Sequence, residues 1–214
     1  MIGVIDYGAS NIQSIGNALT KLNQPFELVP EASGLSRFDK LILPGVGAAG
    51  SAMKKLKETG FAEVLPKVKV PVLGLCLGLQ LFAEYSEENE TKCLSIIPAK
   101  VRRFSPALKV PQMGWNMVKL VKESPLTTGI PDGSYFYFVH SYYLDLPAAP
   151  GPTASGAQAG AAQAGTQEYI IGSADYGVMF PAIIQKDNFY AVQFHPEKSG
   201  PLGLKVVENF CRGI

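Results

Sequence analysis

Residues 70–78 read Val70-Pro71-Val72-Leu73-Gly74-Leu75-Cys76-Leu77-Gly78, an apolar run that ends in a cysteine flanked by glycines. The run predicts a buried strand, and glycines two positions either side of Cys76 allow a sharp strand-to-helix turn. The start of the following helix offers unpaired N–H groups and a positive dipole end, which favour a thiolate over a thiol. The stretch therefore predicts a reactive cysteine at a sheet edge.

The first half of the chain repeats this alternation of apolar strands and amphipathic helices. Because such strands are buried on both faces, the alternation predicts a parallel sheet covered by helices on both sides. The expected strands are 2–5, 26–30, 39–43 and 70–75, and the expected helices are about 11–23, 48–58 and 77–85.

The second half suggests hairpins and mixed pairing. We therefore expect one α/β domain over 1–214, with a central mixed, mostly parallel sheet flanked by helices and an additional antiparallel portion. The expected strands are 99–103, 116–121, 135–139, 168–174, 181–186 and 189–194, followed by a helix over about 201–211.

A second turn, Pro44-Gly45-Val46-Gly47, follows the strand that ends at Leu43. Loops at the carboxyl ends of parallel strands meet at one edge, so this turn should lie near Cys76. An acyl-transfer site needs two N–H donors aimed at the developing oxyanion. The amide of Leu77 is the expected first donor, and Val46 or Gly47 the second.

His195-Pro196-Glu197 follows another apolar run, 190–194. A base and a carboxylate two residues apart can share one face of an extended segment. We expect the antiparallel part of the sheet to bring them to Cys76 and form a Cys–His–Glu catalytic triad. The alternatives are a structural histidine, a solvated carboxylate beside Lys198, and a zinc site, which would need further ligands. No metal or organic cofactor is expected.

Two other side chains carry weaker signals. His140 follows an aromatic strand and is expected to be a core or supporting histidine rather than a second base. Trp115, taken in isolation, is typical of core or interface packing.

Composition excludes several classes of protein. Hydrophobic residues make up 47% of the 214 residues, charged residues 17%, and the formal net charge is +1, so neither nucleic acid nor a membrane is an expected partner.

Three cysteines without a CxxC pair, and an N-terminus without a signal peptide, indicate a reducing compartment, the cytoplasm. Residues 148–167 contain only Ala, Gly, Pro, Thr, Ser and Gln, which predicts a surface loop insertion without catalytic role.

The motifs together resemble the class I (triad) glutamine amidotransferases. Within that family they are similar to the glutaminase subunits of imidazole glycerol phosphate synthases, over nearly the whole chain except 148–167. The resemblance rests on Pro44–Gly47, Gly74–Gln80 and Gln193–Gly200, and more narrowly on Asp6-Tyr7-Gly8 with Asn11, Pro111–Asn116, Phe138–Tyr142 and Asp175-Tyr176-Gly177.

The resemblance implies that Cys76 attacks the side-chain amide of glutamine while His195 acts as base and then as acid. Ammonia would pass through a protected channel to a cyclase subunit with a (β/α)8-barrel fold, in a heterodimer that makes imidazole glycerol phosphate and the purine precursor aminoimidazole carboxamide ribotide (AICAR) during histidine biosynthesis. The family positions around bound glutamine match Gly45, Gly47, Gln80, Ser141 and Tyr142, and those facing the cyclase match Met113, Trp115, Asn116 and Lys198.

Alternatives remain at this stage. The chain could be the amidotransferase subunit of anthranilate or aminodeoxychorismate synthase, although those usually carry a histidine where this chain has Leu79. It could also be a stand-alone cysteine hydrolase of related fold, or a catalytically silent interaction subunit.

Overall fold

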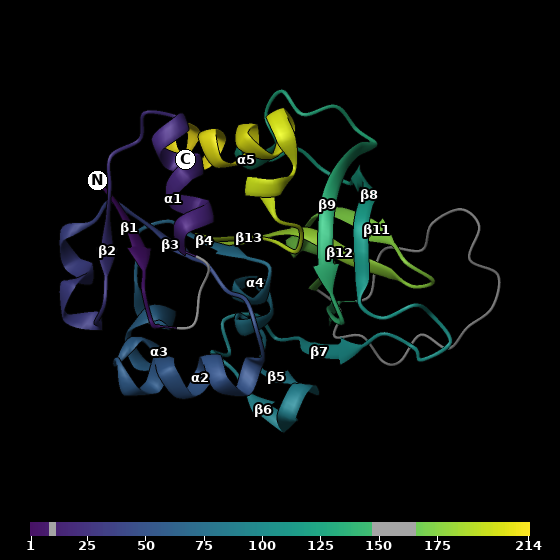
Figure 1. The fold of residues 1–214 in the computed structure, drawn as a ribbon, viewed down its shortest axis with the longest axis horizontal. Helices are drawn as coiled ribbons and strands as arrows, with labels where there is room; N and C mark the ends of the chain where they lie inside the picture. Colours follow the sequence, from purple (N-terminus) through teal and green to yellow (C-terminus); the bar gives the residue numbers. More distant parts are fainter. Residues whose placement is uncertain (9–11, 147–165) are drawn as a thin grey trace.

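A nine-stranded mixed sheet forms the centre of the computed structural model, which describes residues 1–8, 12–146 and 166–214 (Figure 1). The sheet is parallel over its first five strands and antiparallel over the rest, which confirms the predicted mixed sheet. In order across the sheet, the strands are β2 (Phe26–Val29), β1 (Ile2–Ile5), β3 (Lys40–Leu43), β4 (Val72–Leu75), β13 (Phe189–Val192), β12 (Met179–Lys186), β11 (Ile170–Asp175), β8 (Gln112–Leu120) and β9 (Ser134–His140).

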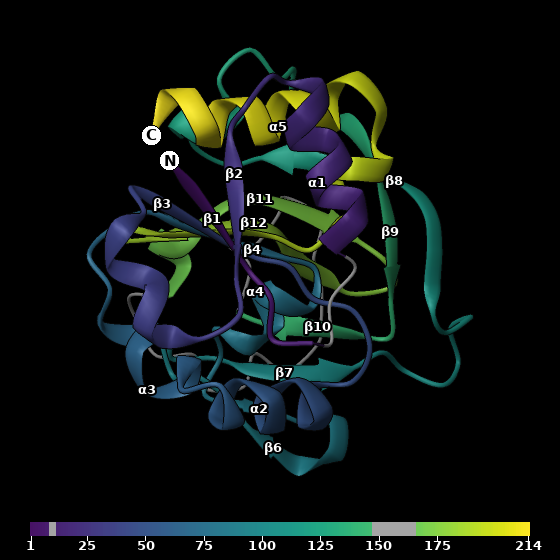
Figure 2. The ribbon, with the colours of Figure 1, turned by 60° about the vertical axis from the view of Figure 1, so that its left-hand side comes forward.

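Helices cover both faces of the parallel half. α1 (Ile12–Lys21) and α5 (Gly200–Gly213) lie together on one face, and α2 (Ala49–Glu58) and α3 (Phe61–Val64) lie on the other (Figures 1 and 2). The side chains of β3 show why both faces need cover. Leu41 and Leu43 belong to the core that includes α2 and α3, whereas Ile42 belongs to the core that includes α1 and α5. Because strand side chains alternate between faces, a continuously apolar strand fills two cores.

A second, four-stranded sheet lies on the α2 side of the molecule (Figure 1). Its strands, in order, are β10 (Tyr142–Asp145), β7 (Lys100–Arg103), β5 (Tyr85–Ser86) and β6 (Thr91–Lys92). The helix predicted over 77–85 is wrong in its second half, since α4 spans only Leu77–Leu81. The backbone N–H of Glu84 bonds the carbonyl of Ala99 at 2.9 Å, so the chain has already left the helix to pair with this second sheet.

Short 3-10 helices complete the described segments. They are η1 (Ala32–Arg37), η2 (Leu65–Lys67), η3 (Glu88–Glu90), η4 (Pro125–Thr127), η5 (Thr166–Tyr169) and η6 (Pro196–Lys198). Most of the low-complexity stretch 148–167, together with Asn11 of the family motif, lies outside the described residues. In the part of the chain that the structure describes, no helix is long and apolar enough to cross a membrane.

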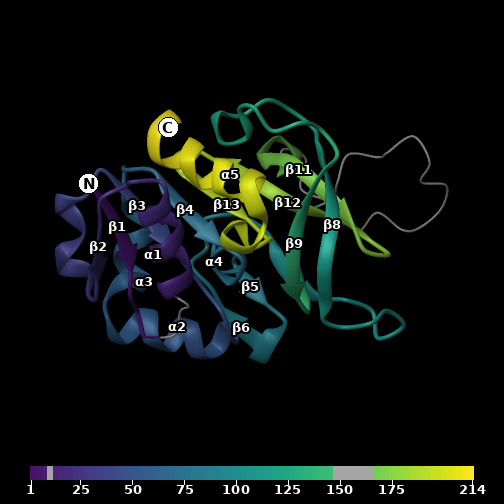
Figure 3. The ribbon, with the colours of Figure 1, turned by 45° about the horizontal axis from the view of Figure 1, so that its top comes forward.

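β13 joins the two halves of the sheet, and its neighbours determine where the site forms. It pairs in parallel with β4 and antiparallel with β12. The expectation that an antiparallel strand would bring His195 to Cys76 therefore needs correction, because β13 and β4 point the same way and end at the same edge. β8 and β9 form the end of the sheet opposite β2 (Figure 3).

Candidate active site

Cys76 occupies a strained backbone turn between β4 and α4. Its φ of 51° and ψ of −103° lie in a region that residues with a side chain rarely adopt. Its N–H donates to the carbonyl of Val192 at 2.8 Å, and its own carbonyl accepts from Leu79 N at 3.1 Å. These bonds hold the turn, so the sulfur projects from the end of β4 as in a nucleophile elbow.

The flanking glycines serve close packing rather than backbone freedom. A Cβ on Gly78 would lie 2.2 Å from the carbonyl oxygen of Leu43, and one on Gly74 would lie 2.9 Å from the carbonyl of Gly78. Neither glycine has a positive φ. The sequence interpretation is therefore corrected: Cys76 itself adopts the unusual conformation, and Gly74 and Gly78 let α4 pack directly on the strands.

His195 and Glu197 form a buried ion pair at the end of β13. His195 Nδ1 donates to Glu197 Oε1 at 2.9 Å, and the two side chains are only 6% and 8% exposed. Their spacing predicted that His195 and Glu197 would share one face of an extended segment. That prediction is wrong. His195 is the first flanking residue of η6, and the turn of this 3-10 helix brings the carboxylate back to the ring.

The loop that holds His195 is fastened to β9. The N–H of His195 donates to the carbonyl of Tyr137 at 2.9 Å. Ser199 Oγ donates to the carbonyl of His195 at 2.7 Å and accepts from Tyr137 N at 2.9 Å. Backbone and side chain together therefore fix the position of the ring.

The pKa of His195 reports the charge state of this site. Burial by itself lowers that pKa, but hydrogen bonds to the Cys76 sulfur and to the Glu197 carboxylate, together with their charges, raise it to about 10. Since Nδ1 is committed to Glu197, Nε2 is the nitrogen that serves the sulfur. A pKa of about 10 keeps the His195 ring protonated at neutral pH, opposite the Cys76 sulfur.

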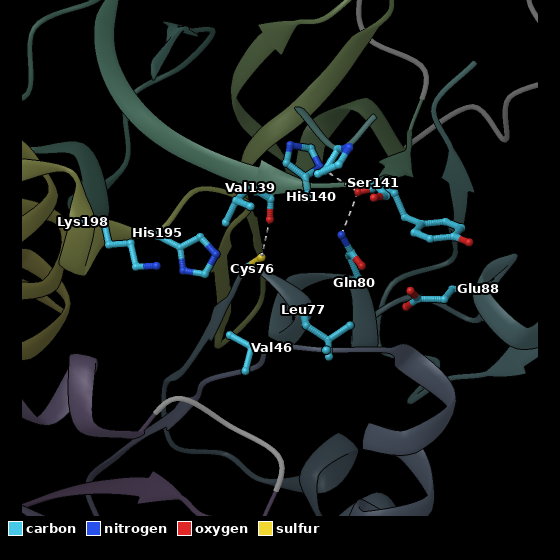
Figure 4. A pocket seen from close by; sticks show the side chains of 13 residues that line it. Val46, Cys76, Leu77, Gln80, Glu88, Val139, His140, Ser141, His195 and Lys198 are labelled. Atoms are coloured by element: carbon cyan, nitrogen blue, oxygen red, sulfur yellow. Dashed lines mark hydrogen bonds between the residues drawn. The ribbon is translucent and has the colours of Figure 1, made fainter. Parts of the chain in front are cut away.

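Cys76 and His195 open into one cavity of about 320 Å³ (Figure 4). Besides Cys76, eight residues that the sequence predicted at the site line this cavity. Val46 and Gly47 are among them, so the turn that holds them lies beside the elbow. The full lining consists of Val46, Gly47, Cys76, Leu77, Gln80, Glu88, Pro111, Val139, His140, Ser141, Tyr142, His195 and Lys198.

Two of the expected catalytic and substrate-binding residues, Gly45 and Glu197, do not line this cavity. Gly45 packs beneath the elbow, where a Cβ would lie 2.8 Å from that of Leu77. Glu197 lies behind His195 and, with Gly45, borders a separate space of only about 10 Å³. A carboxylate that orients a base need not reach the substrate, so the position of Glu197 suits its expected role.

The carbonyl of Tyr142 fixes two polar side chains of the cavity. It accepts from Gln80 Nε2 at 2.8 Å and from His140 Nδ1 at 2.8 Å (Figure 4). Burial lowers the pKa of His140 to about 4, the hydrogen bond to Tyr142 opposes that shift, and the charge of His195 adds to it. His140 is therefore neutral at physiological pH, in keeping with a supporting rather than a basic role.

Two residues at the site were missed by the sequence interpretation. Glu88 lines the cavity, and its Oε2 accepts from Ala49 N at the start of α2 at 2.7 Å. Gln193 is fully buried, and its Nε2 donates to Cys76 Sγ at 3.7 Å. Glu88 stands in a polar stretch with no motif, whereas Gln193 carries a usable signal, an amide inside an otherwise apolar strand run.

Of the residues expected to face a partner, three lie on the two sides of β8 and Lys198 lies in η6. Met113 and Trp115 are 64% and 57% exposed on its outer face. Asn116 points the other way and donates to the carbonyl of Asp175 at 2.9 Å. Lys198 is exposed and lies next to His195 at the cavity (Figure 4).

The model of the family "Glutamine amidotransferase class-I" matches residues 3–214. The chain therefore belongs to the class-I glutamine amidotransferases. Solved structures of similar shape include a glutamine amidotransferase from Thermotoga maritima (TM-score 0.60, 19% identity, 98% of this chain and 81% of that one) and another glutamine amidotransferase (TM-score 0.69, 18% identity, 100% and 99%). At these identities they support the fold alone.

Curated relatives narrow the family. The chain is 45% identical to the imidazole glycerol phosphate synthase subunit HisH of Methanocaldococcus jannaschii (98% of each chain) and 43% identical to that of Desulfitobacterium hafniense strain Y51 (100% of this chain, 95% of the relative). Within the class, the chain belongs to the HisH family. This decides against the anthranilate and aminodeoxychorismate alternatives.

Proposed function

We propose that Cys76, His195 and Glu197 hydrolyse glutamine to glutamate and ammonia, as the glutaminase subunit of an imidazole glycerol phosphate synthase. The observation that carries the proposal is that Cys76 and the His195 ring line one cavity, while Nδ1 of the ring bonds Glu197 Oε1 at 2.9 Å. Nucleophile and base therefore lie at the wall of one cavity, and the orienting carboxylate lies behind the base.

The geometry supports a two-step reaction. The thiolate of Cys76 attacks the side-chain amide carbon, and the charge that develops on oxygen is stabilised by the N–H of Leu77 and by the turn at Val46 and Gly47. The His195 imidazolium protonates the departing nitrogen, the C–N bond breaks, and ammonia leaves a glutamyl thioester. Water then gives a proton to His195 and attacks the thioester. The C–S bond breaks, and glutamate and the thiolate are released.

Glu88 suits recognition of the amino-acid end of the substrate. It supplies a carboxylate to the cavity wall on the side of Gln80 (Figure 4). One of its oxygens is already held by the backbone of Ala49. A carboxylate fixed in this way favours the α-ammonium group of glutamine, so it would orient the side-chain amide toward Cys76.

The product calls for a protected route to a partner protein. Ammonia released to water becomes largely ammonium, which is not a nucleophile. The partner we propose is a cyclase with a (β/α)8-barrel fold. Its docking surface would be the outer face of β8 and β9, where Met113, Trp115, Met117 and Tyr135 form an exposed apolar patch. Val139 lies on β9 and also lines the cavity, so a partner on this hairpin would sit beside the site.

We also propose that the protein works in the cytoplasm. Cys76, Cys93 and Cys211 are all free thiols. A nucleophilic cysteine and unpaired neighbours suit a reducing compartment.

The test is a glutaminase assay of the chain with and without a cognate cyclase. Wild type should release glutamate, and Cys76→Ser should lose more than about a thousandfold in rate. Trp115→Ala should weaken the cyclase complex roughly tenfold or more, the cost typical of an aromatic anchor, as measured by titration calorimetry. Leu28→Ala, an exposed apolar residue on β2, is the matched control and should bind as wild type. Undiminished activity in Cys76→Ser would overturn the proposal.

A further inference from the structure

A line of hydrogen bonds connects the second sheet to the nucleophile. Gln80 Nε2 donates to the carbonyl of Tyr142 at 2.8 Å and to Gln193 Oε1 at 3.1 Å. Gln193 Nε2 in turn donates to Cys76 Sγ at 3.7 Å. The line thus runs from a backbone carbonyl through two side-chain amides to the reacting sulfur.

The direction of each bond in this line follows from its first member. A backbone carbonyl can only accept, so Gln80 must turn its nitrogen toward Tyr142. The second hydrogen of the same nitrogen then faces Gln193, which must present its oxygen. The nitrogen of Gln193 is left facing Cys76. Rotating the Gln193 amide by half a turn would set two nitrogens face to face and an oxygen against the sulfur.

Burial makes this arrangement rigid and electrostatically effective. Gln193 is 0% exposed and Gln80 is 4% exposed. The backbone N–H of Gln193 also bonds the carbonyl of Ala182 on β12 at 2.9 Å. Water therefore does not compete for the amide, and an N–H aimed at a charged atom in such surroundings is stronger than in solution.

We propose that Gln193 is a catalytic residue, whose buried amide donates a hydrogen bond that stabilises the Cys76 thiolate, and that Gln80 positions it. The bond acts twice in the reaction. It stabilises the Cys76 thiolate before the attack, and it stabilises the thiolate again when the C–S bond of the thioester breaks. His195 stabilises the thiolate from another direction, so the sulfur has two independent supports.

A consequence for substrate binding follows from the same bonds. Both hydrogens of the Gln80 amide are used within the protein, by Tyr142 and Gln193. The carbonyl oxygen of Gln80 is then the group it can offer in the cavity, so Gln80 accepts a hydrogen bond from the substrate and does not donate one. This part rests on the proposed glutaminase function.

The test measures the ionisation of Cys76 through its alkylation by iodoacetamide as a function of pH, on the full chain. Gln193→Leu removes the donor. Removing a hydrogen bond to a charged group should lower the alkylation rate roughly tenfold at pH values below the midpoint and shift the midpoint upward. Cys76→Ser gives the background from Cys93 and Cys211. Gln185→Leu, a hydrogen-bonded glutamine of β12 remote from the sulfur, is the matched control and should leave the profile unchanged.

The other titratable groups near the sulfur stay in place in all these variants. They are His195 and Glu197 from η6, His140 from β9, and Tyr7, whose pKa is raised by burial and by the charge of Cys76. Their contributions therefore cancel in the comparison with wild type.

Two further variants make the outcome decisive. Gln80→Leu removes only the positioning bond and should shift the profile in the same direction by a smaller amount. If Gln193→Leu does not fold, as judged by circular dichroism, the nearly isosteric Gln193→Glu replaces it and should also shift the midpoint upward. A midpoint within about 0.2 units of wild type in the folded variant would overturn the proposal. It would leave the proposed function intact, because that function depends on the Cys76→Ser assay.

Discussion

The bond between His195 and Glu197 allows charge to be removed with little change of shape. Glu197→Gln keeps an oxygen that can accept from His195 Nδ1 at 2.9 Å, but it removes the negative charge. Both side chains are more than nine-tenths buried, so solvent screening of that charge is weak. A hydrogen bond to a charged partner contributes about 1.5–3 kcal/mol, of which a neutral one retains about 1 kcal/mol.

The expected loss follows from that difference. A deficit of about 0.5–2 kcal/mol in stabilising the imidazolium corresponds to roughly a 2- to 30-fold fall in kcat/KM. The fall should lie mainly in kcat, since Glu197 does not line the substrate cavity. The amide can also rotate and donate to Nδ1, which would impose the wrong tautomer and deepen the loss.

The same substitution should change the pH dependence. The Glu197 charge is among the causes that raise the pKa of His195 to about 10, so Glu197→Gln lowers that pKa. The ring then loses its proton at a lower pH. The assay is glutaminase activity of the cyclase complex between about pH 6 and 10, with NMR titration of the imidazole. Glu58→Gln, in a surface ion pair with Lys55, is the control. A kcat/KM within twofold of wild type and an unmoved titration would refute the reasoning.

Three other substitutions test separate parts of the structure. Gly47→Ala should lower kcat about tenfold or more at nearly unchanged stability, because φ is +93° at an open position of the oxyanion turn; steady-state kinetics and thermal unfolding check it. His140→Leu should weaken the loss of stability in acid. The folded-state pKa of about 4 lies below the unfolded value of 6.5, so the His140 contribution is present above pH 6.5 and disappears, by up to about 3 kcal/mol, as pH falls through 4; urea unfolding at pH 7, 5 and 4 measures it. Lys40→Met should lower Tm by about 3–6 °C, since Lys40 Nζ bonds the carbonyls of Phe210 and Cys211 at the end of α5 at 3.1 and 2.6 Å, whereas exposed Lys54→Met should not; calorimetry compares the two.

The parallel half of the fold could be predicted because its signals are local. β1, β3 and β4 are short continuously apolar runs, and each lies within the range expected from the sequence. β10 could not be found in this way. Tyr142–Asp145 alternates weakly in burial, and its pairing with β7 joins Tyr142 to Arg103, far back along the chain. Long-range pairing of this kind depends on the assembled fold rather than on periodicity.

The triad could be predicted for a different reason. Two short motifs contain the triad: one holds Cys76, and the other holds His195 and Glu197. The second motif predicts the right residues even though the backbone after His195 is a 3-10 helix and not a strand. Glu88 lies in no motif, and Gln193 begins the Gln193–Gly200 motif without a role that its spacing reveals. Their contacts, with Ala49 and with Cys76, join residues 39 and 117 positions apart. Such contacts exist only once the sheets have packed.

The antiparallel half of the sheet positions the chemistry, although the parallel half carries the nucleophile. β9 supplies the carbonyl of Tyr137 to the backbone of His195, and the N–H of Tyr137 to Ser199, which in turn holds the carbonyl of His195. The carbonyl of Val139, on the same strand, faces Cys76 Sγ at 3.9 Å. On the exposed face of this hairpin, Trp115 is paired with Tyr137, and its ring packs edge-on against that of Tyr137 with centroids 6.1 Å apart. β9 therefore contacts both the nucleophile and the base, and its outer face carries part of the exposed patch. The distance between the imidazole and the sulfur thus depends on where β9 lies relative to β4, and not on the elbow alone.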